Sequence, residues 1–326
     1  MDRRGALAAT AAFAASCVAT VAHAQTGRKI PVVAHLDASE RSEWFAALKR
    51  QLKDLGYVEG STIAYETRTA DGALDRLRPM AQDLVRLKVD VIVTSGTAAA
   101  MAAKRVTTKI PIVMATGTDQ VSLGLAASLA HPGGNVTGLS TITSELSAKR
   151  FELLRELLTN KLARVAVLWH AENVSSMASI RDIETAAAKA AVALQPVSVG
   201  SGEELADAFA AMGRERAQGV IVVQTPLMYA ERKTIAGLAL KGRLPSMFGA
   251  AEFVDAGGLV SYGPSYPELY RRAAIYVDKI LRGASPGALP IEEPTAVELV
   301  VNASTAKALA ITIPPAMLAR VSRVIS

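Results

Sequence analysis

Short runs rich in Val and Ile recur along this chain and alternate with segments that carry the apolar spacing of amphipathic helices. Such runs are typical of parallel strands that are buried on both faces of a sheet. In the first half we expect strands at 30–36, 62–67, 89–94 and 110–115 and helices at 40–55, 74–87 and 97–105. In the second half we expect strands at 164–169, 195–199, 219–223 and 246–248 and helices at 145–158, 175–194, 203–212 and 231–241. The pattern predicts an α/β fold with two doubly wound parallel-sheet lobes.

Between the two halves lies the segment 131–140, with the sequence HPGGNVTGLS. Its Pro-Gly-Gly turn is expected to end a short helix at 121–130, and a brief strand is expected to follow the turn. A second strand bracketed by glycines, at 257–263, indicates a return crossing between the lobes. We therefore expect hinges at the two crossings, formed by Thr137, Gly138, Leu139, Tyr262 and Gly263.

These crossings divide the chain into an expected first lobe at 28–138 and an expected second lobe at 139–263. In the remaining segment, 264–326, we expect a helix at 267–281, a strand at 297–302 and a last helix after 314–315. Part of this segment is expected to return to the first lobe. The sequence does not say which lobe each of its elements joins.

The first residues have the three parts of a secretory signal peptide. A basic pair at 3–4 precedes an apolar run at 5–21, and Ala-His-Ala at 22–24 follows, which predicts cleavage after Ala24. A lipid anchor at Cys17 is the alternative, although the Ala-Ala-Ser before it fits that signal poorly. Cleavage would remove the single cysteine, and no later apolar run is long enough to span a membrane. We therefore expect an exported, periplasmic protein without disulfides.

Charge and motifs narrow the classes of function. The formal net charge is +6, and the charged residues are interspersed, so no nucleic-acid partner is expected. The chain contains no G-x-G-x-x-G or G-x-x-x-x-G-K-[ST] motif for a nucleotide and no H-E-x-x-H motif for a metal. We therefore expect no cofactor, no metal site and no catalytic residues.

Polar residues follow two strands of the first half, at the edge where ligands bind in parallel sheets. These residues are Ser95, Gly96 and Thr97 after one strand and Thr116, Gly117 and Asp119 after the next. Backbone N–H groups and hydroxyls at a helix start can hold a carboxylate. Each loop could equally be an ordinary helix cap and turn, and that interpretation stays open.

Two strand ends of the second half carry further candidates. His170 and Asn173 follow one strand, and Phe248 and Glu252 lie at the end of another. The histidine could also be an ordinary loop residue. Glu252 could pair with the ammonium group of a ligand or with the first turn of its own helix.

Six segments carry a more specific signal, at 55–60, 86–94, 126–140, 253–259, 271–281 and 305–309. They resemble the ABC transporter substrate-binding proteins of the tryptophan/tyrosine-uptake type, most specifically at 126–140. The resemblance implies export, a type I periplasmic-binding fold and delivery of a small solute to a membrane permease driven by an ATPase. It also implies a ligand between the lobes, which adds Gln224, after the strand at 219–223, to the candidate site residues.

The sequence departs from the family pattern at two cleft loops. Asp-Gln stands at 119–120 where the family usually has Asp-Pro, and His-Ala stands at 170–171 where Asn-Pro is common. The identity of the solute is therefore open.

The leading hypothesis is a monomeric receptor of an ABC import system that closes two lobes around a small, carboxylate-bearing, amino-acid-like solute. Two other classes stay open. An exported enzyme could use the same cleft, with Asp119, His170 or Glu252 as acid–base groups. The sensor half of a transcriptional regulator can share this fold, although the signal peptide and the absence of an N-terminal DNA-binding segment count against it.

Overall fold

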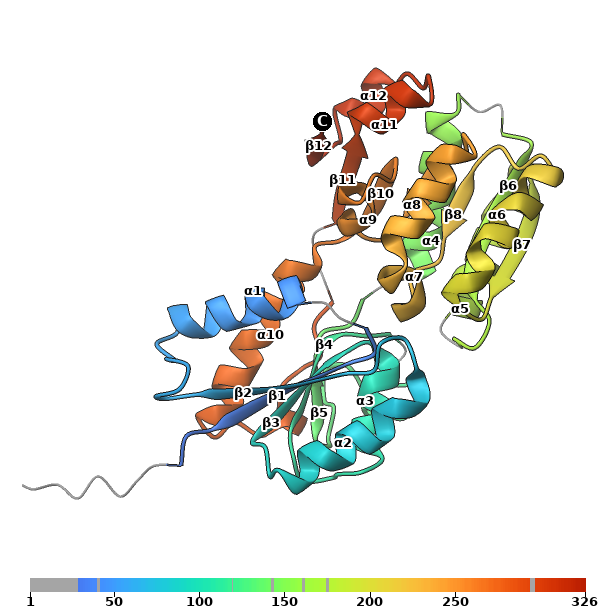
Figure 1. Ribbon diagram of the computed structural model, residues 1–326. Helices are drawn as coiled ribbons and strands as arrows, with labels where there is room; N and C mark the ends of the chain where they lie inside the picture. Colours follow the sequence, from blue (N-terminus) through green and yellow to red (C-terminus); the bar gives the residue numbers. More distant parts are fainter. Residues whose placement is uncertain are drawn as a thin grey trace, which may run out of the picture. The chain divides into compact units, whose positions relative to one another are not determined.

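The computed structural model describes residues 29–39, 42–118, 120–141, 144–159, 162–173, 176–293 and 297–326. Within these residues the chain builds two β-sheets, each with helices on both faces (Figure 1). We call the five-stranded sheet and its helices the first lobe, and the seven-stranded sheet and its helices the second lobe. The predicted signal peptide at 1–24, with Cys17, lies outside the described residues.

The first sheet is parallel throughout, in the order β2-β1-β3-β4-β5. Its strands are β1 (Val32–Asp37), β2 (Ala64–Thr69), β3 (Val91–Ser95), β4 (Ile112–Thr116) and β5 (Val136–Gly138). Helices α1 (Ser42–Asp54) and α10 (Tyr266–Leu281) pack on one face, and α2 (Leu77–Arg86) and α3 (Thr97–Lys104) pack on the other. Successive residues of β1 enter different cores, because Val33 joins the core of Trp44 and Ala34 joins the core of Leu84. This two-sided burial explains the continuous apolar runs.

The second sheet has the order β12-β11-β10-β9-β8-β6-β7 and is parallel except between β10 and β11. Its strands are β6 (Arg164–His170), β7 (Ala193–Val199), β8 (Val220–Val222), β9 (Ser246–Phe248), β10 (Val260–Pro264), β11 (Val297–Asn302) and β12 (Arg323–Ile325). Its helices are α4 (Ser144–Leu157), α5 (Ser176–Lys189), α6 (Leu205–Arg214), α7 (Pro226–Ala230), α8 (Arg232–Lys241), α9 (Ala251–Asp255), α11 (Ala303–Ala308) and α12 (Pro315–Leu318). Val167 joins the core of Phe151 from α4, whereas Leu168 joins the core of Phe209 from α6. The same alternation therefore buries both faces of this sheet.

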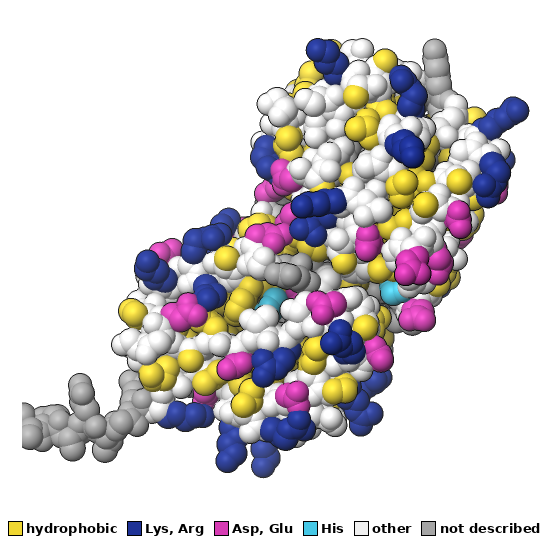
Figure 2. Space-filling view, viewed as in Figure 1, with side chains coloured by type: hydrophobic (Ala, Val, Ile, Leu, Met, Phe, Trp, Pro, Cys, Tyr) yellow, Lys and Arg dark blue, Asp and Glu magenta, His cyan; other side chains and the backbone are white. Residues whose placement is uncertain are grey.

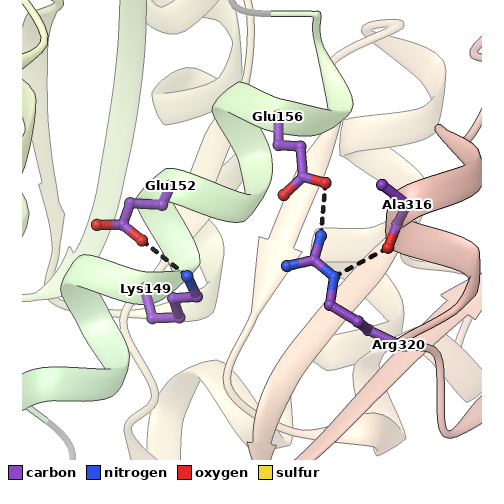
Figure 3. A network of polar contacts seen from close by, with 5 residues as sticks. All are labelled: Lys149, Glu152, Glu156, Ala316 and Arg320. Atoms are coloured by element: carbon purple, nitrogen blue, oxygen red, sulfur yellow. Dashed lines mark hydrogen bonds and ion pairs between the residues drawn. The ribbon is translucent and has the colours of Figure 1, made fainter.

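Ion pairs between side chains join the C-terminal segment to the second lobe. Arg320 pairs with Glu156 of α4 and donates from Nε to the Ala316 carbonyl at 3.0 Å (Figure 3). Lys149 and Glu152 form a separate pair within α4. Arg323 of β12 pairs with Asp255 of α9 at 3.0 Å. The last strands therefore extend the second sheet, whereas α10 packs on the first.

The chain passes between the lobes three times. It leaves the first lobe after β5, returns from β10 into α10, and leaves again along 289–293 toward β11. The third passage lies beside the first, because the Ser140 N–H donates to the Glu292 carbonyl at 2.8 Å and the Glu292 N–H donates to the Gly138 carbonyl at 3.0 Å. Only two crossings were expected from the sequence, so this third one was missed.

The two crossings expected from the sequence each contain a glycine against the backbone of a neighbouring segment, β4 in one case and the residue after β9 in the other. A Cβ atom on Gly138, where φ is +124°, would lie 2.2 Å from the carbonyl oxygen of Met114. A Cβ atom on Gly263 would lie 2.0 Å from the carbonyl oxygen of Gly249. A larger residue at either position would require a strand to move. The role of these segments as hinges stays a prediction.

The two-sheet α/β architecture expected from the sequence is confirmed, with two local differences. The helix expected at 121–130 is wrong: these residues form turns and bends, Gly124 has φ +67°, and Leu125 and Ala126 are buried without a helix between them and the exposed Val121. The helix expected at 175–194 ends at Lys189. Elements α7, α11 and β12 were not expected, because segments this short show no clear hydrophobic period.

Candidate functional site

A cavity of about 180 Å³ lies between loops of the two lobes. On the first-lobe side it is lined by the loops that follow β3 and β4 and by the start of α3. On the second-lobe side it is lined by the loops that follow β6 and β8 and by α4. These are carboxyl ends of parallel strands, which is where the topology predicts a ligand.

The two first-lobe loops are hydrogen-bonded to each other. The Gly96 N–H donates to Thr116 Oγ1 at 2.9 Å. The Thr97 hydroxyl donates to the Thr118 carbonyl at 3.1 Å and accepts from the Thr118 N–H at 3.0 Å. The start of α3 therefore lines the cavity, but the Gly96 N–H and the Thr97 hydroxyl are engaged within their own lobe. This wall is organised before any ligand arrives.

The second lobe presents two amide side chains to the cavity. Asn173 and Gln224 line the cavity, and the Oε1 atom of Gln224 is buried without a hydrogen-bond partner among the described residues. A Cβ atom on Gly249 would lie 3.1 Å from both Gln224 Oε1 and Arg150 Nη2. Glycine at this position therefore leaves room for the amide and the guanidinium to lie close together.

Arg150 is a buried cation in the cavity wall. Arg150 is 4% exposed, its Nε donates to the Tyr262 carbonyl at 2.7 Å, and its Nη1 donates to Ser147 Oγ at 3.4 Å. No carboxylate of the described chain pairs with it. Burial lowers the pKa of the Arg150 guanidinium, and Tyr266 and Tyr262 oppose that change. Because arginine titrates far above neutral pH, the group stays charged, and the cavity favours an anion beside it.

An apolar wall completes the cavity. Trp44 of α1 stacks on Tyr266 of α10, with ring centroids 4.3 Å apart and an interplanar angle of 8°. Leu74 and Met101 lie in the same lining. The site therefore combines one buried cation, two amide side chains, the carboxyl of Glu172 and an apolar surface, which is the composition of a small-molecule site.

The structure brings many of the predicted site residues together. Those that line the cavity are Ser95, Gly96, Thr97, Thr116, Gly117, Asn173 and Gln224. Asp119 lies outside the described residues. His170, Phe248 and Glu252 are not among the lining residues.

Each of these three side chains has a different neighbourhood. Phe248 is fully buried and stacks on Phe253 at 4.7 Å. His170 is 4% exposed, and burial lowers the pKa of its imidazole. Glu252 accepts a hydrogen bond from the indole N–H of Trp44, and burial raises the pKa of its carboxyl. A strand-end rule places a loop at the site without fixing where each side chain points.

Arg150 and Trp44 were missed by the sequence analysis. A signal for Arg150 exists, because the helical period places it on the same stripe as Leu146, Leu154 and Leu157. A cation in line with leucines is a candidate for burial. No comparable signal marks Trp44, whose position depends on the packing of α1 against α10.

The surface carries charges of both signs. On the face drawn in Figure 2, Lys and Arg side chains are interspersed with Asp and Glu side chains over both lobes. Among the described residues, ion pairs such as Lys49 with Glu59 and Arg164 with Glu215 join neighbouring surface groups. The charge distribution agrees with the mixed pattern in the sequence.

Two α/β lobes with a cavity at their strand ends form an architecture suited to holding a small solute. The chain belongs to the ABC transporter substrate binding protein family, which it matches over residues 29–325. A tyrosine-binding protein from Clostridioides difficile (strain R20291) is 28% identical over 261 residues, which cover 80% of this chain and 74% of that protein.

Solved structures show the same fold. A conserved domain protein from Vibrio cholerae is similar with a TM-score of 0.84 and 27% identity, covering 91% of this chain and 100% of that one. A domain from Streptococcus pneumonia in complex with L-Trp has a TM-score of 0.83 and 23% identity, covering 90% of this chain and 99% of its own. The family, the fold and the role as a solute-binding receptor predicted from the sequence are thereby confirmed.

Family membership places the receptor outside the cytoplasm and gives it an ABC permease as partner. Within the described ranges, no helix combines the length and the apolar character that crossing a membrane requires.

Proposed function

We propose that this chain is a periplasmic receptor for a small carboxylate-bearing solute and that Arg150 neutralises the carboxylate. The observation that carries the proposal is the Arg150 guanidinium, which is 4% exposed, lines the cavity and has no acidic partner among the described residues. Its planar fork of N–H donors matches the two oxygens of a carboxylate. An anionic solute would offset the cost of burying this charge, which a neutral solute would not.

The proposed solute is amino-acid-like, with an aromatic or extended apolar side chain. The apolar wall of Trp44, Leu74, Met101 and Tyr266 suits such a side chain. The names of the relatives support the same class, since one is a tyrosine-binding protein and another holds L-Trp. Gln224 and Asn173 are candidates for the remaining polar groups of the solute.

The proposed action is closure of the two lobes on the solute. We propose a first lobe made of 28–138 with α10 and a second lobe made of 139–263 with 297–326, hinged at the crossings that contain Gly138 and Gly263. Binding shifts an open–closed equilibrium, and the permease and its ATPase recognise the closed form. The receptor acts as a monomer and performs no covalent chemistry.

Export follows from the N-terminal sequence. The basic pair, apolar run and small-residue end of residues 1–24 support a signal peptide cleaved after Ala24, and hence a periplasmic location. The enzyme alternative loses support, because His170 and Glu252, two of its three acid–base candidates, are not among the cavity-lining residues.

The test is a thermal-shift screen of the purified chain, followed by calorimetry on the hits. The panel pairs L-amino acids and aromatic carboxylic acids with the corresponding carboxamides. A solute at 100 times its dissociation constant should stabilise the protein by about 2.7 kcal/mol. We expect the acids to bind and the carboxamides to bind at least tenfold more weakly.

Two results would count against this function. Equal binding of an acid and its carboxamide would remove the role of Arg150, and chemical conversion of the bound solute would favour an enzyme.

A further inference from the structure

The first turn of α1 contacts the second lobe through two ring–carboxylate pairs. Trp44 donates its indole N–H to Glu252 of α9, and Tyr229 of α7 donates its hydroxyl to Glu43. Each lobe thus contributes one ring and one carboxylate. We call Glu43, Trp44, Tyr229 and Glu252 the interlobe latch.

The rings of the latch are packed as well as hydrogen-bonded. Trp44 and Tyr229 are 1% and 0% exposed, and their ring centroids lie 4.8 Å apart. Tyr229 also packs edge-on against Phe253, and the Arg232 guanidinium lies 4.5 Å from the centroid of the Tyr229 ring. Separating the lobes would expose both rings and break both hydrogen bonds together.

The two carboxylates accept hydrogen bonds from the rings and do not face the solute, since neither Glu43 nor Glu252 lines the cavity. Burial raises the pKa of the Tyr229 hydroxyl, and the charges of Glu252 and Glu43 raise it further, so the hydroxyl keeps its proton and remains a donor. Of the four latch residues, only Trp44 contributes to the cavity wall. The latch therefore meets the site at a single side chain.

We propose that the interlobe latch holds the two lobes closed, and that Glu43 and Glu252 are positioning residues that fix Trp44 in the cavity wall without touching the solute. The inference rests on the proposed function for what the cavity holds, but the latch acts on closure itself. Its bonds exist only when the lobes are together, so their loss shifts the population toward the open form and speeds release of the solute.

The experiment measures interlobe distances by double electron–electron resonance in the full chain. Spin labels are attached at Gln82→Cys in α2 and Glu184→Cys in α5, two exposed positions on different lobes. Cys17→Ser removes the single natural cysteine. Distances are recorded without solute and with L-tyrosine as the probe.

Without solute, Glu252→Met and Trp44→Phe should each lower the ratio of short-distance to long-distance populations about tenfold, because each removes one charge-assisted hydrogen bond. The double variant should resemble the single variants, since both changes delete the same bond. Glu252→Gln retains an acceptor oxygen and should stay within about threefold of the unchanged protein. Asp255→Asn, on the same helix but paired with Arg323, is the matched control and should change nothing.

An unchanged distance distribution in Glu252→Met would overturn the latch. So would an unsubstituted protein whose solute-free distances already match those of that variant. If L-tyrosine and the wider solute panel leave the unsubstituted protein unaffected, the proposed function fails, while the solute-free comparison still decides the latch.

Discussion

The two faces of the cavity differ in chemistry. Among the described residues, the first-lobe face has no charged side chain in the cavity lining, and its loops are bonded to each other through Gly96, Thr97 and Thr116. The second-lobe face carries the buried guanidinium of Arg150, the exposed carboxyl of Glu172 and the amide of Gln224, whose Oε1 has no hydrogen-bond partner among the same residues. The polar groups of the first-lobe loops therefore bind one another, whereas Arg150 and Gln224 can still bind a solute. We infer that a solute gains most of its polar binding free energy from the second lobe.

The crossings that join these unlike faces are built alike. Gly138 lies against the backbone of Met114 in the first lobe, and Gly263 lies against the backbone of Gly249 in the second. Substitutions at the crossings and substitutions in the cavity lining can therefore test the similarity of the crossings and the difference between the faces separately.

The largest expected effect is the loss of stability on substituting a glycine at one of the crossings. Gly138→Ala should lower the free energy of unfolding by about 3 kcal/mol, because the new Cβ meets a backbone oxygen and φ is unfavourable for alanine. Urea unfolding measures the change. Gly237→Ala in α8, where a Cβ would meet nothing within 4 Å, is the matched control and should be neutral or stabilising. If Gly138→Ala is as stable as the unsubstituted chain, this crossing tolerates a side chain and the close packing does not require glycine.

The next effect is on the charged face. Arg150→Met should weaken binding of a carboxylate solute about 100-fold, because a charge-assisted hydrogen bond contributes about 2–3 kcal/mol. Calorimetry measures the affinity, and Lys149→Met on the same helix serves as the control. Because the variant also loses the hydrogen bonds of the guanidinium to the Tyr262 carbonyl and to Ser147 Oγ, urea unfolding is used to verify that it is folded. Unchanged affinity would show that the charged face is not the binding face.

A smaller effect is expected on the neutral face. Ser95→Ala combined with Thr97→Ala should weaken solute binding about tenfold, through loosening of the loop bonds to Thr118. The measurement is calorimetry beside Thr234→Ala, an exposed position on α8. A loss larger than that of Arg150→Met would reverse the comparison between the two faces.

The smallest effect concerns the third crossing, where Glu292 binds Arg272 of α10 through two bonds of 2.7 and 2.9 Å. These bonds hold the pKa of Glu292 below its ordinary value. The pair therefore stabilises the fold fully above the ordinary glutamate pKa, and the contribution is lost as the pH falls through the lower folded value. Because both side chains are well exposed, Glu292→Gln should cost at most about 1 kcal/mol at pH 7.

Urea unfolding at pH 7 and pH 3 tests this difference. The gap between Glu292→Gln and the unsubstituted chain should shrink at pH 3. The exposed neighbour provides the control variant, Glu293→Gln, which should show no such trend. A gap that persists at pH 3 would mean that the effect is not the ion pair.

Much of the fold was readable because buried parallel strands leave a strong pattern. Runs such as 91–95 and 112–116 are apolar on both faces, and their ends fix where the loops fall. The helix predicted at 121–130 is wrong because Gly124 has φ +67° and Leu125 joins the core of the first sheet from an irregular segment. The third crossing was missed because 289–293 is recognised by its bonds to residues 138–140, which are remote in sequence.

The candidate site was predictable in part for the same reason. Strand ends identified Ser95 to Thr97 and Thr116 to Gly117, since topology alone brings these loops to one edge of the first sheet, whereas the family resemblance added Gln224. Arg150 was not identified, because its burial depends on β10 passing over α4. The direction of Glu252 depends likewise on α1, more than 200 positions away. Topology locates a site, whereas the packing of distant helices decides which side chains enter it.

The position of α10 along the chain has a consequence for the order of folding. The first sheet ends at Gly138, but α10, which shares one face of that sheet with α1, does not begin until Tyr266. During synthesis α1 alone is available to this face while β6 to β10 of the second lobe are made. Contacts between such distant segments form slowly. The first lobe of such a chain remains incompletely folded until α10 is available, which keeps a protein that must cross a membrane unfinished on the side where it is made.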